Sequence, residues 1–325
     1  MEYRDYREYY KLPKKKTNKI KLKEMPVLKI RCGVSGGLPF NTLMTDVVSG
    51  CLAIDNVCYG NCTACDFWVK QGYDFGNRNN NIFDKNIFIS DLRKLPKDVK
   101  WLRQGWVSDC SFSNDSWQLV ADISNILASY NIFMLIITKI HKYPSDSILE
   151  TLKKNNTEIR VSVSALDSPE EHEKRIKFLK HYKNIGGRAI PYLMSAKYNN
   201  SILNNNQNII VQEIIENDFI AGEHPLRIDY DNPIYSLLAK GGFSHFKFKK
   251  QYWFGRIMGD IPNFVLPPPT HLENNYCLKF FSFNECRMGE LPIFKNLPTY
   301  NDLKNNSNIL TKEMNKHAAY IVQEN

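Results

Sequence analysis

The chain has 325 residues, of which 43% are apolar and 24% are charged, and its formal net charge is +9. This composition is typical of a soluble globular protein, and the length allows one large domain or two ordinary ones. No run of about 18 apolar residues is present and the N-terminus lacks the apolar core of a secretory signal, so we expect a cytoplasmic protein with no membrane contact.

The positive charge is concentrated near the N-terminus. Residues 1–24 contain nine Lys or Arg and four Asp or Glu, which leaves +4 for the rest of the chain. Two interpretations of this basic arm remain open. It is either a solvated, partly disordered segment or a clamp for an acidic partner such as a nucleic acid.

Taken in chain order, the elements begin with a candidate strand at 27–34 and a turn at 35–41. Apolar runs and helical periodicities then alternate from about residue 50 to residue 235. Strands are predicted at 51–57, 99–106, 132–139, 157–165, 188–195 and 224–230. Helices are predicted at 86–95, 116–130, 144–154, 168–187 and 208–219. Asn-rich stretches at 76–81 and 202–208 predict loops.

Local signals mark the ends of two helices. Ser116 is a plausible N-cap for the helix at 116–130. The helix that follows Ser168 begins with Pro169 at its first position and ends at Gly186 and Gly187, so its start and stop signals agree.

Regular alternation predicts parallel strands joined by crossover helices, that is, an α/β fold. A full eight-fold barrel needs about 250 residues, so six units favour a partial (β/α)6 TIM-type barrel, with an open doubly wound sheet as the alternative. The chain is therefore predicted to have three parts: a basic N-terminal extension (1–49), the core (50–235) and an aromatic-rich C-terminal extension (236–325). We expect the last part to fold back over the barrel and contribute to a substrate pocket. Ligands are expected at the carboxyl ends of the strands.

Three of the eight cysteines, Cys58, Cys62 and Cys65, lie in the stretch NVCYGNCTACDFW. Eight cysteines are too sparse for a disulfide scaffold, and a tight cluster in such a chain favours a metal site. A closed zinc site needs four ligands, and the nearest His in the sequence is His141. Three thiolates suit a [4Fe–4S] cluster in which one iron keeps an open position for a substrate or cofactor.

The spacing C-x3-C-x2-C in CYGNCTAC resembles the signature of the radical S-adenosylmethionine enzymes, which carry it in the first βα loop of a partial (β/α)6 barrel. The resemblance implies that the open iron binds S-adenosylmethionine (SAM) through its amino and carboxylate groups. One electron from a flavodoxin- or ferredoxin-type donor then cleaves SAM, and the resulting 5'-deoxyadenosyl radical removes a hydrogen atom from a substrate. The family usually has an aromatic residue before the last cysteine. Ala64 stands there in this chain, so Tyr59 or Phe67 would pack against the adenine.

The resemblance implies further SAM contacts at the ends of the following strands. The segment QGWVSDC stands where the family has a Gly-rich motif that accepts the methionine ammonium, although Gly-Gly-Glu itself is missing. The candidates in this segment are Gly105, Ser108 and Asp109, and the alternative for Asp109 is a cap on the following helix. Candidates on later strands are Thr138, Ser162, Ser164 (or Asp167) and Arg227, for which ordinary packing at the barrel mouth is the alternative.

The resemblance does not give the net reaction. A peptide or protein side chain is the favoured substrate, as in enzymes that mature ribosomally made peptides. A nucleic acid is the alternative, because residues 245–256 interleave Lys with aromatic side chains. A non-catalytic iron–sulfur protein is the third hypothesis.

Two cysteines of the C-terminal extension, Cys277 and Cys286, allow three alternative interpretations. The first is that one of them donates a hydrogen atom to a substrate radical. The second is that they are ligands of a second cluster completed by Cys32, Cys51 and Cys110, and the third is that they are small buried hydrophobic residues.

Overall fold

The structure is a computed structural model that describes residues 2–10, 26–34, 41–48, 80–95, 97, 99–105, 108–229, 233–239, 243–247 and 250–255. The strands are β1 (Arg31–Val34), β2 (Asn41–Thr45), β3 (Trp101–Gln104), β4 (Phe133–Thr138), β5 (Glu158–Val163), β6 (Arg188–Ser195), β7 (Gly222–Asp229), β8 (Phe243–Lys247) and β9 (Lys250–Gly255). The helices are α2 (Lys85–Arg93), α3 (Asn114–Ser129), α4 (Asp146–Lys154), α5 (Pro169–Asn184) and α6 (Ser201–Glu216), with short 3₁₀ turns η1 (Tyr6–Glu8) and η2 (Pro233–Leu237).

Within these residues the strands form one sheet in the order β1-β2-β3-β4-β5-β6-β7-β9-β8. Each strand from β2 to β6 pairs in parallel with the next one along the chain, which makes β2 to β7 a parallel series. β1 is antiparallel to β2, and the hairpin of β8 and β9 is added antiparallel to β7. The predicted α/β class with a parallel sheet is therefore confirmed. The sheet also continues across both predicted boundaries, at residues 49/50 and 235/236.

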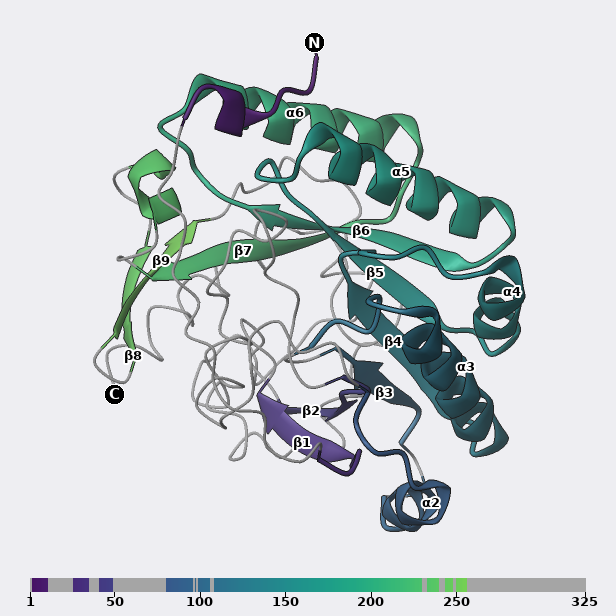
Figure 1. Cartoon of the computed structure of the whole chain (residues 1–325). Helices are drawn as coiled ribbons and strands as arrows, with labels where there is room; N and C mark the ends of the chain where they lie inside the picture. Colours follow the sequence, from purple (N-terminus) through teal and green to yellow (C-terminus); the bar gives the residue numbers. More distant parts are fainter. Residues whose placement is uncertain are drawn as a thin grey trace, which may run out of the picture.

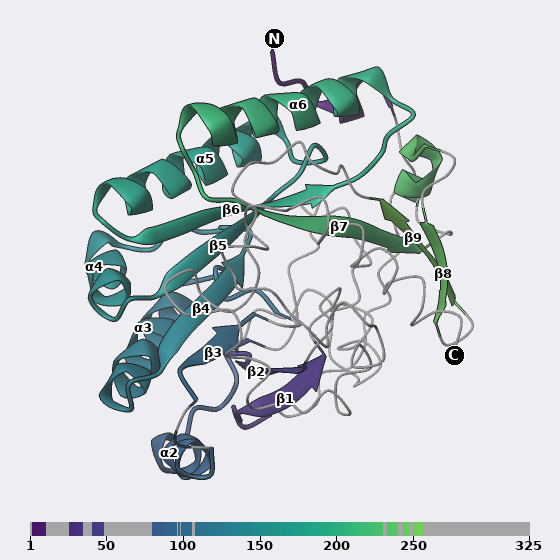
Figure 2. The same ribbon diagram turned by 180° about the vertical axis from the view of Figure 1, so that it is seen from behind.

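The helices lie on one side of a curved sheet. Figures 1 and 2 show α3, α4, α5 and α6 along its convex face. This arrangement is consistent with a partial barrel. No helix within the described part of the chain is long and apolar enough to cross a membrane.

Strand β5 shows how the sequence supplies both faces of the sheet. Alternate residues, Ile159, Val161 and Val163, belong to the apolar core shared with helices α3, α4 and α5. The intervening residues Glu158, Arg160 and Ser162 therefore face the other side, and they too are buried. Burial on both faces is expected of a strand inside a parallel sheet. Each large apolar side chain buried in this core contributes about 1.5–3 kcal/mol.

Five predicted strands are confirmed as β3 to β7, and the predicted strand at 51–57 lies outside the described residues. The first parallel strand that the structure describes is β2, at a position where the sequence analysis predicts no strand. Its sequence, NTLMT, is short and largely polar, so it lacks an apolar run such as the one that marks β4. Pairing with β1 and β3 determines its place.

Two local predictions are wrong. The N-cap of α3 is Ser113, whose side chain accepts a hydrogen bond from the amide of Ser116. Residues 202–208 are not a loop but part of α6, which begins after its N-cap Asn200. The Asn-rich composition is tolerated there because Asn206 and Gln207 are buried and hydrogen-bond to backbone groups outside the helix. The caps predicted at Ser168 and Gly186 are present, with φ of 90° at Gly186.

The first part of the basic arm is docked on the domain. Tyr6 is 5% exposed, and Tyr3 hydrogen-bonds to the loop after β5. The solvated-arm interpretation is therefore wrong for this segment, whereas the Lys-rich residues 11–25 lie outside the described part.

Gly105 directly follows β3 and lies close to the backbone of the neighbouring strand β4. Its φ is 89°, and a Cβ atom there would lie 2.5 Å from the backbone oxygen of Ile137. Residues other than glycine rarely adopt this backbone conformation. The positive φ and the close approach of the Ile137 carbonyl therefore both require glycine at this position.

We predict that Gly105→Ala lowers the free energy of unfolding by about 3 kcal/mol or more, because left-handed strain and a backbone clash add together. Gly186→Ala is the matched control. It has nearly the same φ, but its added Cβ meets only Lys153 Cδ at 3.9 Å, so it should lose only about 1–2 kcal/mol. Urea unfolding of both variants measures the difference, and equal losses would contradict the proposed clash.

Candidate functional site

The carboxyl ends of β2, β3, β4 and β5 lie side by side because these strands are parallel neighbours. Polar residues gather along this edge, at the last position of each strand or just after it: Thr45 and Asp46 at β2, Gln104, Ser108 and Asp109 at β3, Thr138 and Lys139 at β4, and Ser162, Ser164 and Asp167 at β5. Most of them are buried. This is the edge at which parallel α/β folds bind ligands.

Asp109 is the centre of a buried hydrogen-bond network. Its Oδ1 accepts bonds from the amide and hydroxyl of Ser111, at 2.9 and 2.6 Å, and from the hydroxyl of Thr138 at 2.7 Å. Its Oδ2 accepts a bond from the amide of Lys139 at 2.7 Å and lies 3.7 Å from Nε2 of His141. The carboxylate thus joins the loops after β3 and β4. It does not cap α3, so the predicted capping alternative is wrong.

The network also determines the charge of this carboxyl group. Burial by itself would raise the pKa of Asp109, but the His141 imidazole and the hydrogen bonds from Ser111 and Thr138 outweigh it and lower the pKa below the ordinary 3.8. Asp109 is therefore an ionised acceptor with both oxygens engaged. Thr138 is engaged as well, since its hydroxyl also accepts a bond from the amide of Ile140.

A second carboxylate, Asp46, stands at the end of β2 and was not predicted. Its Oδ1 accepts a 2.6 Å hydrogen bond from Ser108, which the sequence analysis does select. Asp46 is 7% exposed. The signal for it would have been its position after a strand, but β2 itself was missed.

Asp46 also belongs to the point at which the residues on either side of the segment 49–79 meet. Asn81 donates from its side chain to the carbonyl of Asp46 at 2.6 Å and from its amide to the carbonyl of Val47 at 2.8 Å. Val48 and Asn80 form an antiparallel bridge beside these bonds. We call residues 46–48 and 80–81 the neck. Residues 49–79, between its two sides, lie outside the described part.

Two buried polar groups next to the neck have no hydrogen-bond partner among the described residues. They are Oγ1 of Thr45 and Nε2 of Gln104. Thr45 and Gln104 are register partners of β2 and β3, and Gln104 accepts a bond from the amide of Val47 through Oε1. A buried polar atom without a partner costs about 1–3 kcal/mol, so this spot favours a polar ligand.

The end of β5 is a tight turn. The amide of Ser164 donates to Asp167, and the hydroxyl of Ser164 accepts from the amide of Leu166. Asp167 forms an ion pair with the fully buried Arg175 of α5. Ser164 is fully buried and Ser162 is 6% exposed. Ser164 therefore shapes the turn, while Ser162 lies nearer the surface on the face turned away from the helices.

The remaining predicted residues are mostly beyond the described part. These are Cys58, Cys62, Cys65, Tyr59, Ala64, Phe67, Cys277 and Cys286, together with Cys51. Cys110 is buried and free, and Cys32 lies on β1. Arg227 lies on β7, where its backbone pairs with Phe254 of β9. Within the described residues, no group of His, Cys, Asp and Glu is arranged to hold a metal ion.

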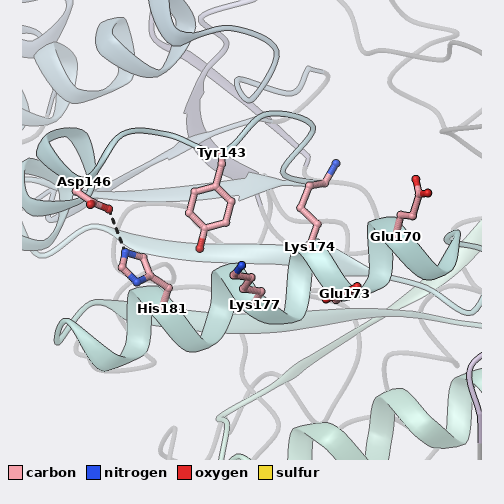
Figure 3. Close-up of a pocket in the computed structure, with 7 residues that line it drawn as sticks. All are labelled: Tyr143, Asp146, Glu170, Glu173, Lys174, Lys177 and His181. Atoms are coloured by element: carbon pink, nitrogen blue, oxygen red, sulfur yellow. Dashed lines mark hydrogen bonds and ion pairs between the residues drawn. The ribbon is translucent and has the colours of Figure 1, made fainter.

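A cavity of about 500 Å³ lies on the helix side of the sheet (Figure 3). Its lining residues are Tyr143, Asp146, Glu170, Glu173, Lys174, Lys177 and His181. His181 Nε2 is 3.2 Å from Asp146 Oδ1, and burial, assisted by Asp146, raises the pKa of Tyr143. None of the predicted site residues lines this cavity, so it is separate from the carboxyl edge.

Comparisons of the chain with protein-family models, with curated proteins and with solved structures found no match.

Asp109→Asn is expected to lower the free energy of unfolding by about 3 kcal/mol at pH 7, because the buried network loses its charge-assisted acceptor. The folded-state pKa is lowered, so the contribution is complete above the ordinary pKa and is lost as pH falls through the folded value. The difference from wild type should therefore shrink below about pH 4. Unfolding curves from pH 7 to pH 3 measure it. The exposed Asp122→Asn is the control, and a pH-independent difference would contradict the assignment.

Proposed function

We propose that this protein is a radical SAM enzyme with a partial (β/α)6 barrel. The observation that carries the proposal is topological. Cys58, Cys62 and Cys65 lie within 49–79, and both ends of that segment are joined at the neck, at the carboxyl end of the first parallel strand that the structure describes. A C-x3-C-x2-C motif after the first strand of a parallel series is the arrangement that the resemblance implies. The curved sheet with helices on its convex face supports the barrel.

The edge around the neck fits the cofactors that this function needs. Three thiolates suit a [4Fe–4S] cluster with one open iron. Thr45 and Gln104 present buried polar atoms close to where the cysteine segment begins, as a polar ligand would require. When bound, the cluster would supply the electron, received from a flavodoxin- or ferredoxin-type donor, that cleaves SAM to the 5'-deoxyadenosyl radical for hydrogen abstraction.

The role proposed here for Asp46 is to accept a hydrogen bond from the ammonium of SAM. A carboxylate suits this task because it accepts hydrogen bonds and its charge strengthens them. Ser108 orients the Asp46 carboxylate by donating to Oδ1. Asp109 suits the task less well, because hydrogen bonds from the loops already engage both of its oxygens.

Cys62→Ala is expected to abolish iron binding and 5'-deoxyadenosine formation after anaerobic reconstitution, whereas wild type should hold about four irons per chain. Cys110→Ala is the control. Burial, assisted by the nearby Asp109, raises the pKa of the Cys110 thiol well above its usual range, so this cysteine is a poor iron ligand. Iron analysis and chromatography of the product with dithionite provide the readout. Product formation by Cys62→Ala would refute the proposal.

Asp46→Asn in the same assay separates the SAM site from the cluster. It should keep the iron content and raise the KM for SAM about tenfold, which corresponds to the loss of one charge-assisted hydrogen bond. An unchanged KM would remove Asp46 from the SAM site without affecting the cysteine assignment.

The proposed substrate is a peptide or protein, modified after translation. A nucleic acid is the second candidate, because the β8–β9 hairpin places basic residues together at its tip. Lys247 and Lys250 are register partners there, and Phe248 and Lys249 connect them in sequence. Lysines beside aromatic residues suit a phosphate backbone with stacked bases.

Binding to a generic single-stranded oligonucleotide distinguishes the two candidates. A peptide substrate predicts no specific, salt-sensitive binding when fluorescence anisotropy is followed from about 50 to 200 mM salt. Affinity that falls steeply with salt, and that Lys247→Ala together with Lys250→Ala weakens, would favour the nucleic acid instead.

A further inference from the structure

The N-terminal strap, residues 2–10, lies over the turn that joins β5 to α5 and beside α6 (Figure 1). Its main contact is made by Tyr3. The phenol donates to the carbonyl of Ser164 at 2.9 Å and lies 3.2 Å from the carbonyl of Asp167. A residue at the start of the chain thus contacts both ends of the turn at the carboxyl edge.

The ring of Tyr3 is held in place by His172 of α5. The two rings are parallel, with their planes at 4° and their centroids 4.1 Å apart. His172 in turn lies with Nε2 2.8 Å from Oε2 of Glu213 on α6. The stack therefore connects the strap to both helices that flank the turn.

Asn206 of α6 fastens the next part of the strap. Its side chain accepts from the amide of Arg4 at 3.0 Å and donates to the carbonyl of Arg4 at 2.7 Å. The same amide group lies 3.4 Å from the carbonyl of Ala165 in the turn. Tyr6 is buried in one cluster with Ala165 and Leu166. Asn206 is fully buried, so this contact is part of the packed structure rather than a surface association.

The turn itself is held from two sides. On the inner side, the ion pair of Asp167 with Arg175 and the bond from the Ser164 amide to Asp167 fix its backbone. On the outer side, the Tyr3 phenol contacts the carbonyls of Ser164 and Asp167, and the Ser164 carbonyl also accepts the turn's own bond from the Asp167 amide. Without the phenol, the turn would keep its inner bonds but lose the outer restraint on Ser164.

We propose that Tyr3 is a positioning residue for SAM. It fixes the turn at the end of β5, and through that turn the position of Ser162, on the face of the sheet opposite the helices. This inference rests on the proposed function, together with the expectation from the sequence that Ser162, at the end of this strand, contacts SAM. Tyr3 contacts the turn at the carbonyls of Ser164 and Asp167, so its effect on SAM would be transmitted through the backbone of Ser164.

Tyr3→Phe tests the role, because the variant keeps the ring stacked on His172 and removes only the hydroxyl. We expect faster amide hydrogen exchange at Leu166 and Asp167, whose amides bond within the turn, and a KM for SAM raised about fivefold with kcat unchanged. Tyr9→Phe is the matched control, since Tyr9 belongs to the same strap but is 55% exposed. It should change neither quantity.

The exchange measurement needs no cofactor, so it tests the effect of Tyr3 on the turn independently of the proposed radical SAM function. Unchanged exchange and unchanged KM in Tyr3→Phe would overturn the positioning role in an enzyme that still cleaves SAM. Faster exchange with an unchanged KM would show that the strap restrains the turn but has no effect on SAM, and this too would overturn it. If wild type forms no 5'-deoxyadenosine, the proposed function fails, and the role toward SAM fails with it.

Discussion

The buried carboxylate of Asp109 is the interaction on which the carboxyl edge depends. The strands of a parallel sheet end side by side, and the buried backbone groups of the loops at that edge need hydrogen-bond partners, which side chains can supply. Here one ionised group accepts from Ser111, Thr138 and the amide of Lys139, and so holds two consecutive loops in one arrangement. The cost of burying the charge is offset because the donors that surround it would otherwise be unsatisfied as well. The position of Ser108, one residue earlier, follows from this network, and with it the contact between Ser108 and Asp46.

Much of the fold was predictable because β3 to β7 carry the pattern that a buried parallel strand requires. In the run 157–165, apolar and polar residues alternate, and the structure shows that both sets are buried on opposite faces. The start of α5 was equally clear, because Ser168, Pro169 and the glycines after the helix give independent signals that agree. These are local properties, and a single sequence contains them.

The misplaced elements depend on contacts between distant parts of the chain. β2 is a strand because β1 and β3 lie on either side of it, and α6 extends through an Asn-rich stretch because Asn206 finds partners in Arg4 and Ala165, far away in the sequence. Asp46 was missed for the same reason, since its relation to Ser108 exists only once β2 and β3 are neighbours. Thr138 was placed correctly at the end of its strand, but the bond from its hydroxyl to Asp109 could not be foreseen, because it joins two loops.

If the proposed function holds, the neck has a consequence for how cofactor assembly and folding are related. Asn81 returns the chain to the point it left at Asp46, so the sheet pairs β2 with β3 regardless of what the intervening segment does. Closing a loop of this size costs an entropy that grows only slowly with length, and hydrogen bonds of the protein itself help to offset it. Small zinc domains, in contrast, remain unfolded until metal arrives. Under the proposed function, the iron site would be an insertion in a framework that folds without it. The metal-free protein would then be expected to keep its fold and to be competent for repeated loading and repair of a cluster.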